Sequence, residues 1–229
     1  MGSDRDPEVE EVDVDVAIAG GHGQIALHIS RMLTQRGDTV RGIIRSEAQA
    51  DDLDDVGATP VVLNIEESDS GALAEAVRGA DAAVFAAGAG PGSGAQRKET
   101  VDYGGAVKLL EAAQHSGIGR YVIISSMGTD DPPDGNGTFA VYLRAKARAD
   151  QAVMRSDVAW TVVRPGGLTN DPGTGNVHLD RHVDRGRIPR EDVAAVIVAV
   201  LDDERTAGHV LEVVSGDMPI GDAVAALVG

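Results

Sequence analysis

The sequence predicts a doubly wound α/β domain, in which helices cover both faces of a parallel sheet. Apolar runs alternate with amphipathic helical patterns along almost all of the 229 residues. The apolar runs lack a polar alternate face, which is typical of strands buried on both sides. The length suits one domain with a full core and is too short for two ordinary ones.

The first half of the chain supplies four strand patterns. "VDVAIAG" (14–20) predicts a strand, and "GQIALHISRMLTQRG" (23–37) predicts a helix that ends at Gly37. "TVRGIIR" (39–45) predicts the second strand and a short helix follows over 46–55. "ATPVVLNI" (58–65) and "DAAVFAAG" (81–88) predict the next two strands, separated by a helix near 70–78.

The second half continues the same alternation. "RYVIISS" (120–126) and "AWTVVRP" (159–165) predict strands, with helices near 97–115 and 139–155. "REDVAAVIVAVLDD" (190–203) predicts a helix, "HVLEVVS" (209–215) a final strand, and a short helix follows near 220–227. Gly/Pro-rich stretches at 88–94, 128–138 and 164–175 all follow strands. Loops at the carboxyl ends of parallel strands face one crevice, so we expect them to border a single site.

Composition limits the classes of partner. The net charge is −17, from 25 Asp and 12 Glu against 17 Arg and 3 Lys, so a nucleic-acid partner is not expected. Such an Asp-rich, Lys-poor chain indicates halophilic adaptation, although an acidic protein from a GC-rich genome would have a similar composition. There is no Cys, and no metal site is predicted.

The ends and the apolar runs suggest where the protein resides. Residues 1–11 are polar and acidic, which predicts a flexible N-terminal segment before a single domain over 12–229. No apolar run is long enough for a membrane span, and the start does not resemble a signal peptide. We therefore expect a cytoplasmic protein without a membrane partner, as a monomer or a homodimer.

A glycine-rich turn joins the first strand to the first helix. Gly20, Gly21 and Gly23 allow the backbone to turn tightly and approach a pyrophosphate, which the helix N-terminus attracts. Its position after a strand and before an amphipathic helix predicts dinucleotide binding. The expected contacts at this turn are Gly20, Gly21, His22, Gly23, Gln24 and Ile25.

The residues at the end of the second strand indicate which dinucleotide is bound. An NAD site usually has an acidic residue there for the ribose hydroxyl, whereas this chain has Arg45 and Ser46. A guanidinium suits a 2′-phosphate, so NADP is the predicted cofactor. Glu47 keeps NAD as the less favoured alternative.

Further motifs follow in a characteristic order: "AAGAGPGSG", "VDYGGAVKLLEAA", "YVIISSMG", "YLRAK" and "RPGGLT". Together with the glycine loop, they resemble the short-chain dehydrogenase/reductase superfamily, and within it the atypical epimerase/dehydratase-like branch related to NmrA-like proteins. The resemblance covers nearly all of residues 12–216 and implies a Rossmann fold with a small C-terminal substrate region. It also implies cofactor contacts at Asn64, Ile65, Ala86, Ala87, Gly88, Ser125, Pro165, Gly166, Gly167 and Leu168.

The resemblance implies a Ser-Tyr-Lys active site. Lys146 would bind the nicotinamide ribose and lower the pKa of Tyr142, which would exchange a proton with a substrate hydroxyl or carbonyl. Ser126 would hold the substrate oxygen, and we prefer it to Ser125 because of its position relative to the strand end. Alternatively, both serines cap the strand and contact the cofactor.

One position departs from the superfamily pattern. Asp102 stands where the resemblance implies an Asn, and it could anchor the Lys146 ammonium directly or through water. The favoured function is an NADP-dependent oxidoreductase or epimerase-like enzyme acting on a small carbonyl or hydroxyl compound. The rivals are an NADP(H) redox sensor with little catalysis, and a flavin or quinone reductase that does not require Tyr142.

Two further features are not assigned to the site. His178 and His182 have a spacing that could hold a metal on a helix, but a third ligand is missing, so contact with substrate is the better interpretation. Trp160 begins the sixth predicted strand and is expected in the core.

Overall fold

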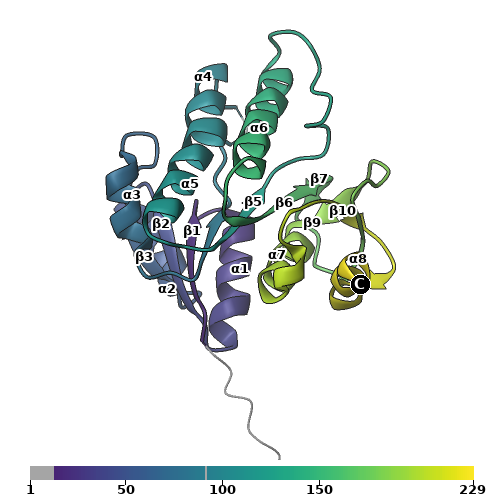
Figure 1. The fold of residues 1–229 in the computed structure, drawn as a ribbon, viewed down its shortest axis with the longest axis horizontal. Coiled ribbons are helices and arrows are strands. Elements are labelled where there is room, and N and C mark those ends of the chain that lie inside the picture. The colour runs from purple at the N-terminus through teal and green to yellow at the C-terminus, as the bar shows by residue number, and fades with distance from the viewer. Residues whose placement is uncertain (1–12, 91) are drawn as a thin grey trace, which may run out of the picture.

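The computed structural model describes residues 13–90 and 92–229, and the predicted flexible segment 1–11 lies outside them. Within these residues a nine-stranded sheet forms the centre of the molecule, in the order β11-β8-β10-β6-β5-β4-β1-β2-β3 (Figure 1). Seven of its strands run parallel: β1 (Asp15–Ala19), β2 (Thr39–Ile44), β3 (Thr59–Val62), β4 (Ala82–Phe85), β5 (Arg120–Ile124), β6 (Ala159–Pro165) and β10 (His209–Ser215).

The remaining strands correct the expectation of a purely parallel sheet. β8 (Asn176–Asp180) pairs antiparallel with β10, and β11 (Met218–Pro219) pairs antiparallel with β8. β7 (Gly167–Thr169) and β9 (Arg187–Pro189) form a separate parallel pair. β8 buries Val177 and Leu179 and exposes His178 and Asp180, as a strand with one covered face does. These strands are short and lie among glycines and prolines, which is why the apolar pattern did not reveal them.

Helices cover both faces of the sheet, as predicted (Figure 1). One face carries α1 (Gln24–Gln35), α2 (Ala50–Asp54), α7 (Arg190–Asp202) and α8 (Ile220–Val228). The other carries α3 (Ser70–Val77), α5 (Ala106–His115) and α6 (Thr138–Met154). The short segments are η1 (Glu47–Gln49), α4 (Ala95–Arg97), a π-helical turn η2 (Lys98–Gly105) and η3 (Glu204–Thr206).

The strands divide their side chains between two hydrophobic cores. In β1, Val16 and Ile18 belong to the core beneath α1 and α7, whereas Ala17 and Ala19 belong to the core beneath α3 and α5. Each core residue of β1 is fully buried, because successive side chains point to opposite faces of a covered strand. Trp160 is half-buried and packs against the second core, consistent with the core position predicted for it.

The strand order places a ligand crevice between β1 and β4. The chain winds from β1 outward to β3 and then returns to β4 on the other side, so the loops after β1 and β4 diverge at this point. In open parallel sheets such a switch point binds ligands at the carboxyl ends of the strands. The predicted fold class, a doubly wound Rossmann-like sheet, is confirmed, with an antiparallel edge added.

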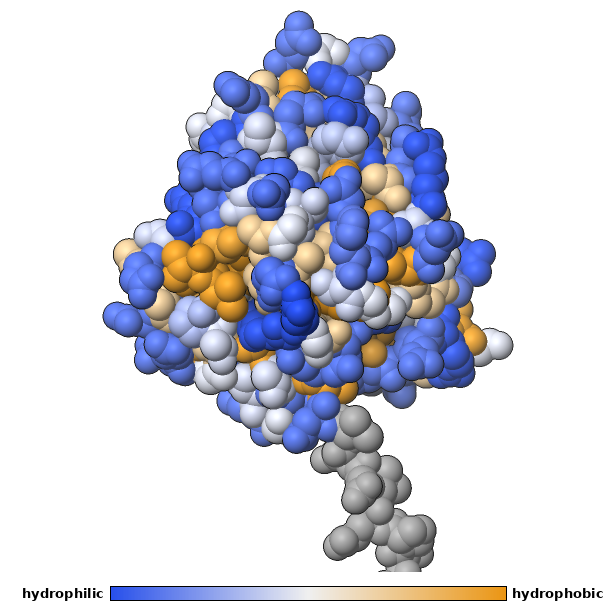
Figure 2. Space-filling model, turned by 60° about the vertical axis from the view of Figure 1, so that its left-hand side comes forward, coloured by the Kyte–Doolittle hydropathy of each residue, from blue (hydrophilic) through white to orange (hydrophobic). Residues whose placement is uncertain are grey.

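The surface seen in Figure 2 is mainly hydrophilic. Figure 2 shows a face dominated by hydrophilic residues, on which apolar residues form separate patches. In the ranges that the structure describes, no helix is both long and apolar enough to cross a membrane.

Candidate active site

The glycine turn between β1 and α1 is built around close backbone approaches. Gly20 has φ +84°, and a Cβ there would lie 2.6 Å from the Ala87 Cα. A Cβ at Gly21 would lie 2.7 Å from the Gly42 Cα. The backbone N–H groups of Gly20 and Gly21 both donate to the Ile43 carbonyl, at 3.1 and 3.0 Å. The turn therefore binds tightly to β2 and leaves the start of α1 open toward the crevice, as a pyrophosphate requires.

A first cavity of about 290 Å³ lies at the switch point. Its lining joins the glycine turn to the ends of β2, β3 and β4. Most predicted cofactor contacts of these loops line it: Gly20, His22, Gly23, Arg45, Asn64, Ile65, Ala86, Ala87 and Gly88. The shape of this cavity and the glycine turn beside it fit one half of an extended dinucleotide.

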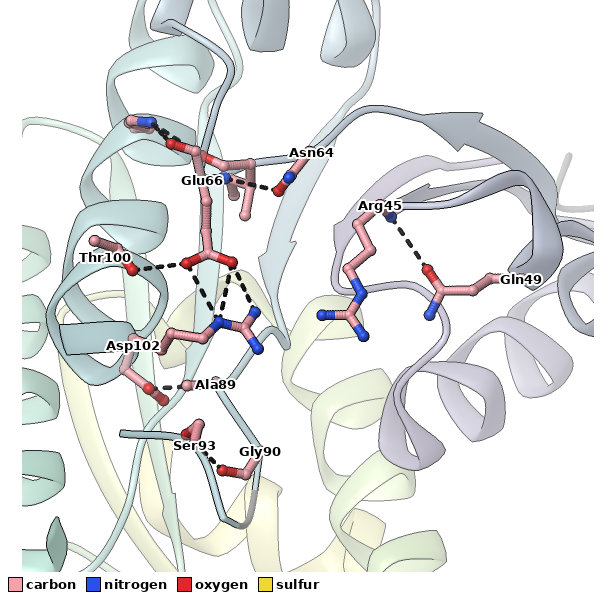
Figure 3. A network of polar contacts seen from close by, with 12 residues as sticks. Arg45, Gln49, Asn64, Glu66, Ala89, Gly90, Ser93, Thr100 and Asp102 are labelled. Carbon is pink, nitrogen blue, oxygen red and sulfur yellow. Dashed lines mark hydrogen bonds and ion pairs between the residues drawn. The ribbon is translucent and has the colours of Figure 1, made fainter. Parts of the chain in front are cut away.

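The far wall of this first cavity carries a charged pair that sequence reasoning missed. The Arg97 guanidinium contacts Glu66 at 2.7 Å, and the Thr100 hydroxyl donates to Glu66 at 2.7 Å (Figure 3). The hydrogen bond from Arg97 lowers the pKa of Glu66. Arg45 lies on the other side of the opening in Figure 3, where its backbone N–H donates to Gln49. Glu66, in the loop after β3, and Arg97, at the end of α4, belong to no motif that would have identified them.

A second cavity of about 510 Å³ adjoins the first and shares with it Ala86, Ala87, Gly88 and Gly90. It extends toward α6 and brings together Asp102, Tyr142 and Lys146, all predicted from the sequence. Ile25, Ser125, Pro165 and Leu168, predicted as cofactor contacts, line it too. Phe139 and Lys98, which the sequence analysis had not singled out, complete the wall.

Lys146 lies at the base of this second cavity and is only 4% exposed. Its Nζ donates to the Ile124 carbonyl at 2.8 Å and lies 4.0 Å from Asp102 Oδ1. Burial lowers the pKa of Lys146 and raises the pKa of Asp102, and in each case the charge of the partner opposes the change. Asp102 Oδ1 is therefore within ion-pair range of the lysine ammonium, and it has no hydrogen-bond partner among the described residues.

Tyr142 is one helical turn before Lys146 on α6 and faces the same cavity. Burial raises the pKa of Tyr142 to about 12, the negative charge of Asp102 adds to this effect, and the Ser126 hydroxyl opposes it. The expected lowering of the Tyr142 pKa by Lys146 is therefore wrong for this structure. Asp102 beside Lys146 offsets the positive charge that would have stabilised a phenolate.

The two serines after β5 have different surroundings. Ser125 is buried and lines the second cavity. The Ser126 hydroxyl donates to the Met127 carbonyl at 3.2 Å, and its effect on Tyr142 is to lower the tyrosine pKa. The structure thus brings Ser125 to the cavity wall and Ser126 to the tyrosine.

A buried ion pair between Asp150 of α6 and Arg164 of β6 joins the helix to the sheet. Asp150 Oδ2 accepts from Arg164 Nε at 3.0 Å and from the Thr129 hydroxyl at 3.1 Å. Arg164 also donates to Asp130 at 2.6 Å. Burial raises the pKa of Asp150, and the Ser125 hydroxyl and Arg164 oppose the change. This network ties the end of β6 to the helix turn after Lys146, and it joins segments too distant in sequence to have been predicted.

Some predicted residues are not at the site. Of the described residues expected to contact a cofactor, Gly21, Gln24, Ser46, Gly166 and Gly167 lie outside the lining of both cavities. Their roles are local: Gly166, for example, donates its N–H to the Val213 carbonyl at 2.9 Å and joins β6 to β10.

The histidine pair is also distant from both cavities. His178 lies on strand β8 and not on a helix, and His182 contacts Glu212 at 3.1 Å. Neither lines the first or the second cavity, so the structure gives no support to a substrate contact by either residue. The described part of the chain contains no group of three metal-binding side chains.

Comparison with known proteins agrees with this geometry. A family described as NAD(P)H-binding matches residues 20–204. The chain belongs to this family. Its members share the segment that runs from the glycine turn to the end of α7, which includes every residue of the two cavities.

Individual relatives extend over almost the whole chain. An uncharacterized sugar epimerase of Bacillus subtilis is 35% identical over 210 residues, covering 91% of this chain and 98% of the relative. A solved structure from Bacillus halodurans, named as an NAD-dependent epimerase/dehydratase, is 38% identical, covers 93% of this chain and 100% of its own, and has a TM-score of 0.87. Sanguinarine reductase from Eschscholzia californica is 27% identical over 255 residues, covering 91% of each chain. The resemblance to the atypical, epimerase/dehydratase-like branch is confirmed, and the chain is an NAD(P)-binding member of an oxidoreductase and epimerase-like family.

Proposed function

We propose that this protein is an NADP-dependent oxidoreductase that reduces a small carbonyl compound, or oxidises the corresponding alcohol, with Tyr142 as the proton-transferring residue. One observation carries the proposal. Tyr142 and Lys146 face an apolar cavity that is continuous, through Ala86–Gly88 and Gly90, with the cavity at the glycine turn. A dinucleotide bound along the first cavity would therefore end beside the tyrosine.

The residues present fit a phosphorylated dinucleotide. The Gly20–Gly21 turn leaves no space for side chains where a pyrophosphate would approach the start of α1. Arg45 is exposed at the edge of the first cavity, where its guanidinium could bind a 2′-phosphate. The nicotinamide, when bound, supplies or accepts the hydride.

The chain's own residues would handle the proton. Because the pKa of Tyr142 is raised to about 12, its hydroxyl stays protonated at neutral pH and can donate to a developing alkoxide. Lys146 is held by the Ile124 carbonyl, with Asp102 within ion-pair range, and it would hydrogen-bond the cofactor ribose. Ser126, beside Tyr142, would orient the substrate oxygen, and Ser125 would contact the cofactor.

The named relatives support redox chemistry at a carbon that bears oxygen or at a similar centre. The Bacillus halodurans protein is named as an NAD-dependent epimerase/dehydratase, the Bacillus subtilis relative as a sugar epimerase, and sanguinarine reductase as a reductase. The match covers nearly the whole length of each of these proteins.

The test is NADPH oxidation with a panel of aldehydes and ketones, comparing the wild type with Tyr142→Phe. General acid catalysis is worth about a hundredfold or more, so kcat should fall by at least that factor in Tyr142→Phe while the Kd for NADPH is retained. Wild-type kcat should not decline between pH 6 and 9 through titration of this hydroxyl, because its pKa is about 12.

Two controls complete the experiment. Tyr103→Phe removes a hydroxyl from a half-buried tyrosine of η2 that lines neither cavity, and its kcat should match the wild type. Ser126→Ala should reduce kcat more than Ser125→Ala. NADPH binding without turnover of any carbonyl compound would overturn the proposal and favour a redox sensor, and turnover of flavins that survives Tyr142→Phe would favour a flavin reductase.

A further inference from the structure

Lys98 is a buried cation at the second cavity that the proposed proton transfer does not use. It begins the π-helical turn η2, is 7% exposed and lines the cavity beside Tyr142. Its Nζ lies 5.3 Å from the centroid of the Tyr142 ring and donates to the Gly90 carbonyl at 2.9 Å. An ammonium can donate three hydrogen bonds, and among the described residues the Gly90 carbonyl is the one acceptor for the Lys98 ammonium. Donor capacity therefore remains for a ligand in the cavity.

The charges around the second cavity do not balance. Its lining has two ammonium groups, Lys98 and Lys146, and one carboxylate, Asp102. Asp102 lies 4.0 Å from the Lys146 ammonium, whereas among the described residues no carboxylate lies within 4.0 Å of the Lys98 ammonium. A chain with net charge −17 has thus placed one excess positive charge on a buried side chain at a mainly apolar cavity, where an unpaired charge is costly. Such a charge is best explained by a ligand that brings the counter-charge.

The position of Lys98 separates it from the dinucleotide phosphates. It lines the second cavity, whereas the glycine turn and Arg45 line the first. The lysine is therefore at the substrate end and close to the tyrosine that would meet the reacting oxygen.

The mouth of the second cavity is apolar. Phe139 is 65% exposed there and stacks on Tyr142 with ring centroids 6.1 Å apart, and Leu168 is 37% exposed. Exposed apolar side chains that border a cavity indicate contact with an apolar ligand. A ligand that satisfies both features has an apolar body and an anionic group.

We propose that Lys98 determines substrate specificity by binding a carboxylate of the substrate, so that the enzyme acts on apolar carbonyl compounds that carry a carboxylate near the carbonyl. This inference rests on the proposed function. Lys98 holds the acid while Tyr142, beside it, donates the proton to the carbonyl oxygen, and Phe139 covers the apolar body.

The test compares acids with their methyl esters as substrates for NADPH oxidation. The pairs are benzoylformate and methyl benzoylformate, 4-carboxybenzaldehyde and methyl 4-formylbenzoate, and 4-oxopentanoate and its methyl ester. A charge-assisted hydrogen bond changes affinity about ten- to a hundredfold, so wild-type kcat/KM should favour at least one acid over its ester by such a factor. Lys98→Met should remove this preference by lowering kcat/KM for the acid. In the same variant, kcat/KM for the ester and the Kd for NADPH should stay within about twofold of the wild type, a change too small for the loss of such a bond.

Two variants control for folding and for general electrostatics. Lys98→Arg keeps a cation and should retain the preference for acids. Arg148→Met removes an exposed cation on the neighbouring helix, outside both cavities, and should also retain it. Equal rates for acids and esters in the wild type, or equal loss of both in Lys98→Met, would overturn the assignment of Lys98.

A binding measurement separates this inference from the proposed function. If no compound is turned over, the proposed function fails, and the same pairs are titrated by calorimetry into the protein saturated with NADP⁺. Binding of an acid but not its ester to the wild type, lost in Lys98→Met, would still support a carboxylate site at Lys98. Absence of that difference would overturn it.

Discussion

Arg45 is the residue on which the choice between NADP and NAD depends. It lies at the opening of the first cavity, opposite the paired Glu66 and Arg97. The positive charge of Arg45 helps to lower the pKa of Glu66, although Arg97 and Thr100 lower it more. Arg97 is therefore occupied by a carboxylate, and Arg45 is the guanidinium at this opening that could bind a phosphate.

Arg45→Ala should raise the Kd for NADPH about tenfold or more, because a charge-assisted pair with phosphate is lost. The Kd for NADH should change by no more than about twofold, since that cofactor has no 2′-phosphate. Both constants are measured by calorimetric titration. Arg155→Ala, an exposed position at the end of α6, is the control and should bind both cofactors as the wild type does. Equal weakening of both cofactors would contradict the assignment to the 2′-phosphate.

Individual residues of the site could be predicted where they belong to a local sequence pattern. Tyr142 and Lys146 are one helical turn apart, so their shared face followed from spacing, and Asp102 was identified from its place in a motif. The contacts between elements were not predictable. The position of Lys98, the Glu66–Arg97 pair and the Asp150–Arg164 pair depend on which segments the fold brings together. Likewise the direction of the Tyr142 pKa shift depends on burial and on Asp102, which only the three-dimensional arrangement reveals.

At the scale of elements, the β1–α1 turn is the part that positions the dinucleotide. Gly20 combines a left-handed backbone with a contact that leaves no space for a Cβ against Ala87. Gly79, after α3, is a useful comparison because it has φ +78° and open space within 4 Å of where its Cβ would be. The two glycines therefore share the backbone requirement and differ in the close approach.

Gly79→Ala should lower the free energy of unfolding by about 1–2 kcal/mol, the cost of a left-handed conformation for an L-residue. Gly20→Ala should lower it by about 3 kcal/mol or more, because the added methyl group also overpacks the contact between β1 and β4. Urea unfolding measures both values, and NADPH titration should show binding lost in Gly20→Ala alone. Equal effects of the two substitutions on stability and binding would contradict this account of the turn.

The elements themselves were largely predictable, with exceptions that have physical causes. The long parallel strands and helices have uninterrupted apolar periodicity, and they appear close to their expected bounds. β7, β8, β9 and β11 have two to five residues each among glycines and prolines, so no periodic signal develops. The helix expected over 97–115 is present but contains the π-helical turn η2, which carries both Lys98 and Asp102. Such turns are frequent at functional sites, and nothing in their sequence marks them.

At the scale of the whole molecule, charge is distributed unevenly. The chain has a net charge of −17, yet the second cavity gathers two of its three lysines, and Arg45 and Arg97 line the first. Cations in the crevice of an acidic protein would concentrate the field on an anionic dinucleotide and an anionic substrate. The halophilic origin, the cytoplasmic location and the monomeric or dimeric state stay predictions.

The central claim is that one crevice holds NADP along the glycine turn and presents its reactive end to Tyr142. A crystal structure of the protein with NADP⁺ bound tests this most directly. We expect the pyrophosphate at the start of α1, the 2′-phosphate at Arg45, and nicotinamide C4 facing the second cavity with the Tyr142 hydroxyl within hydrogen-bond reach of the space beside it. A nicotinamide directed away from the second cavity, with Tyr142 and Lys146 in contact with protein alone, would contradict the account.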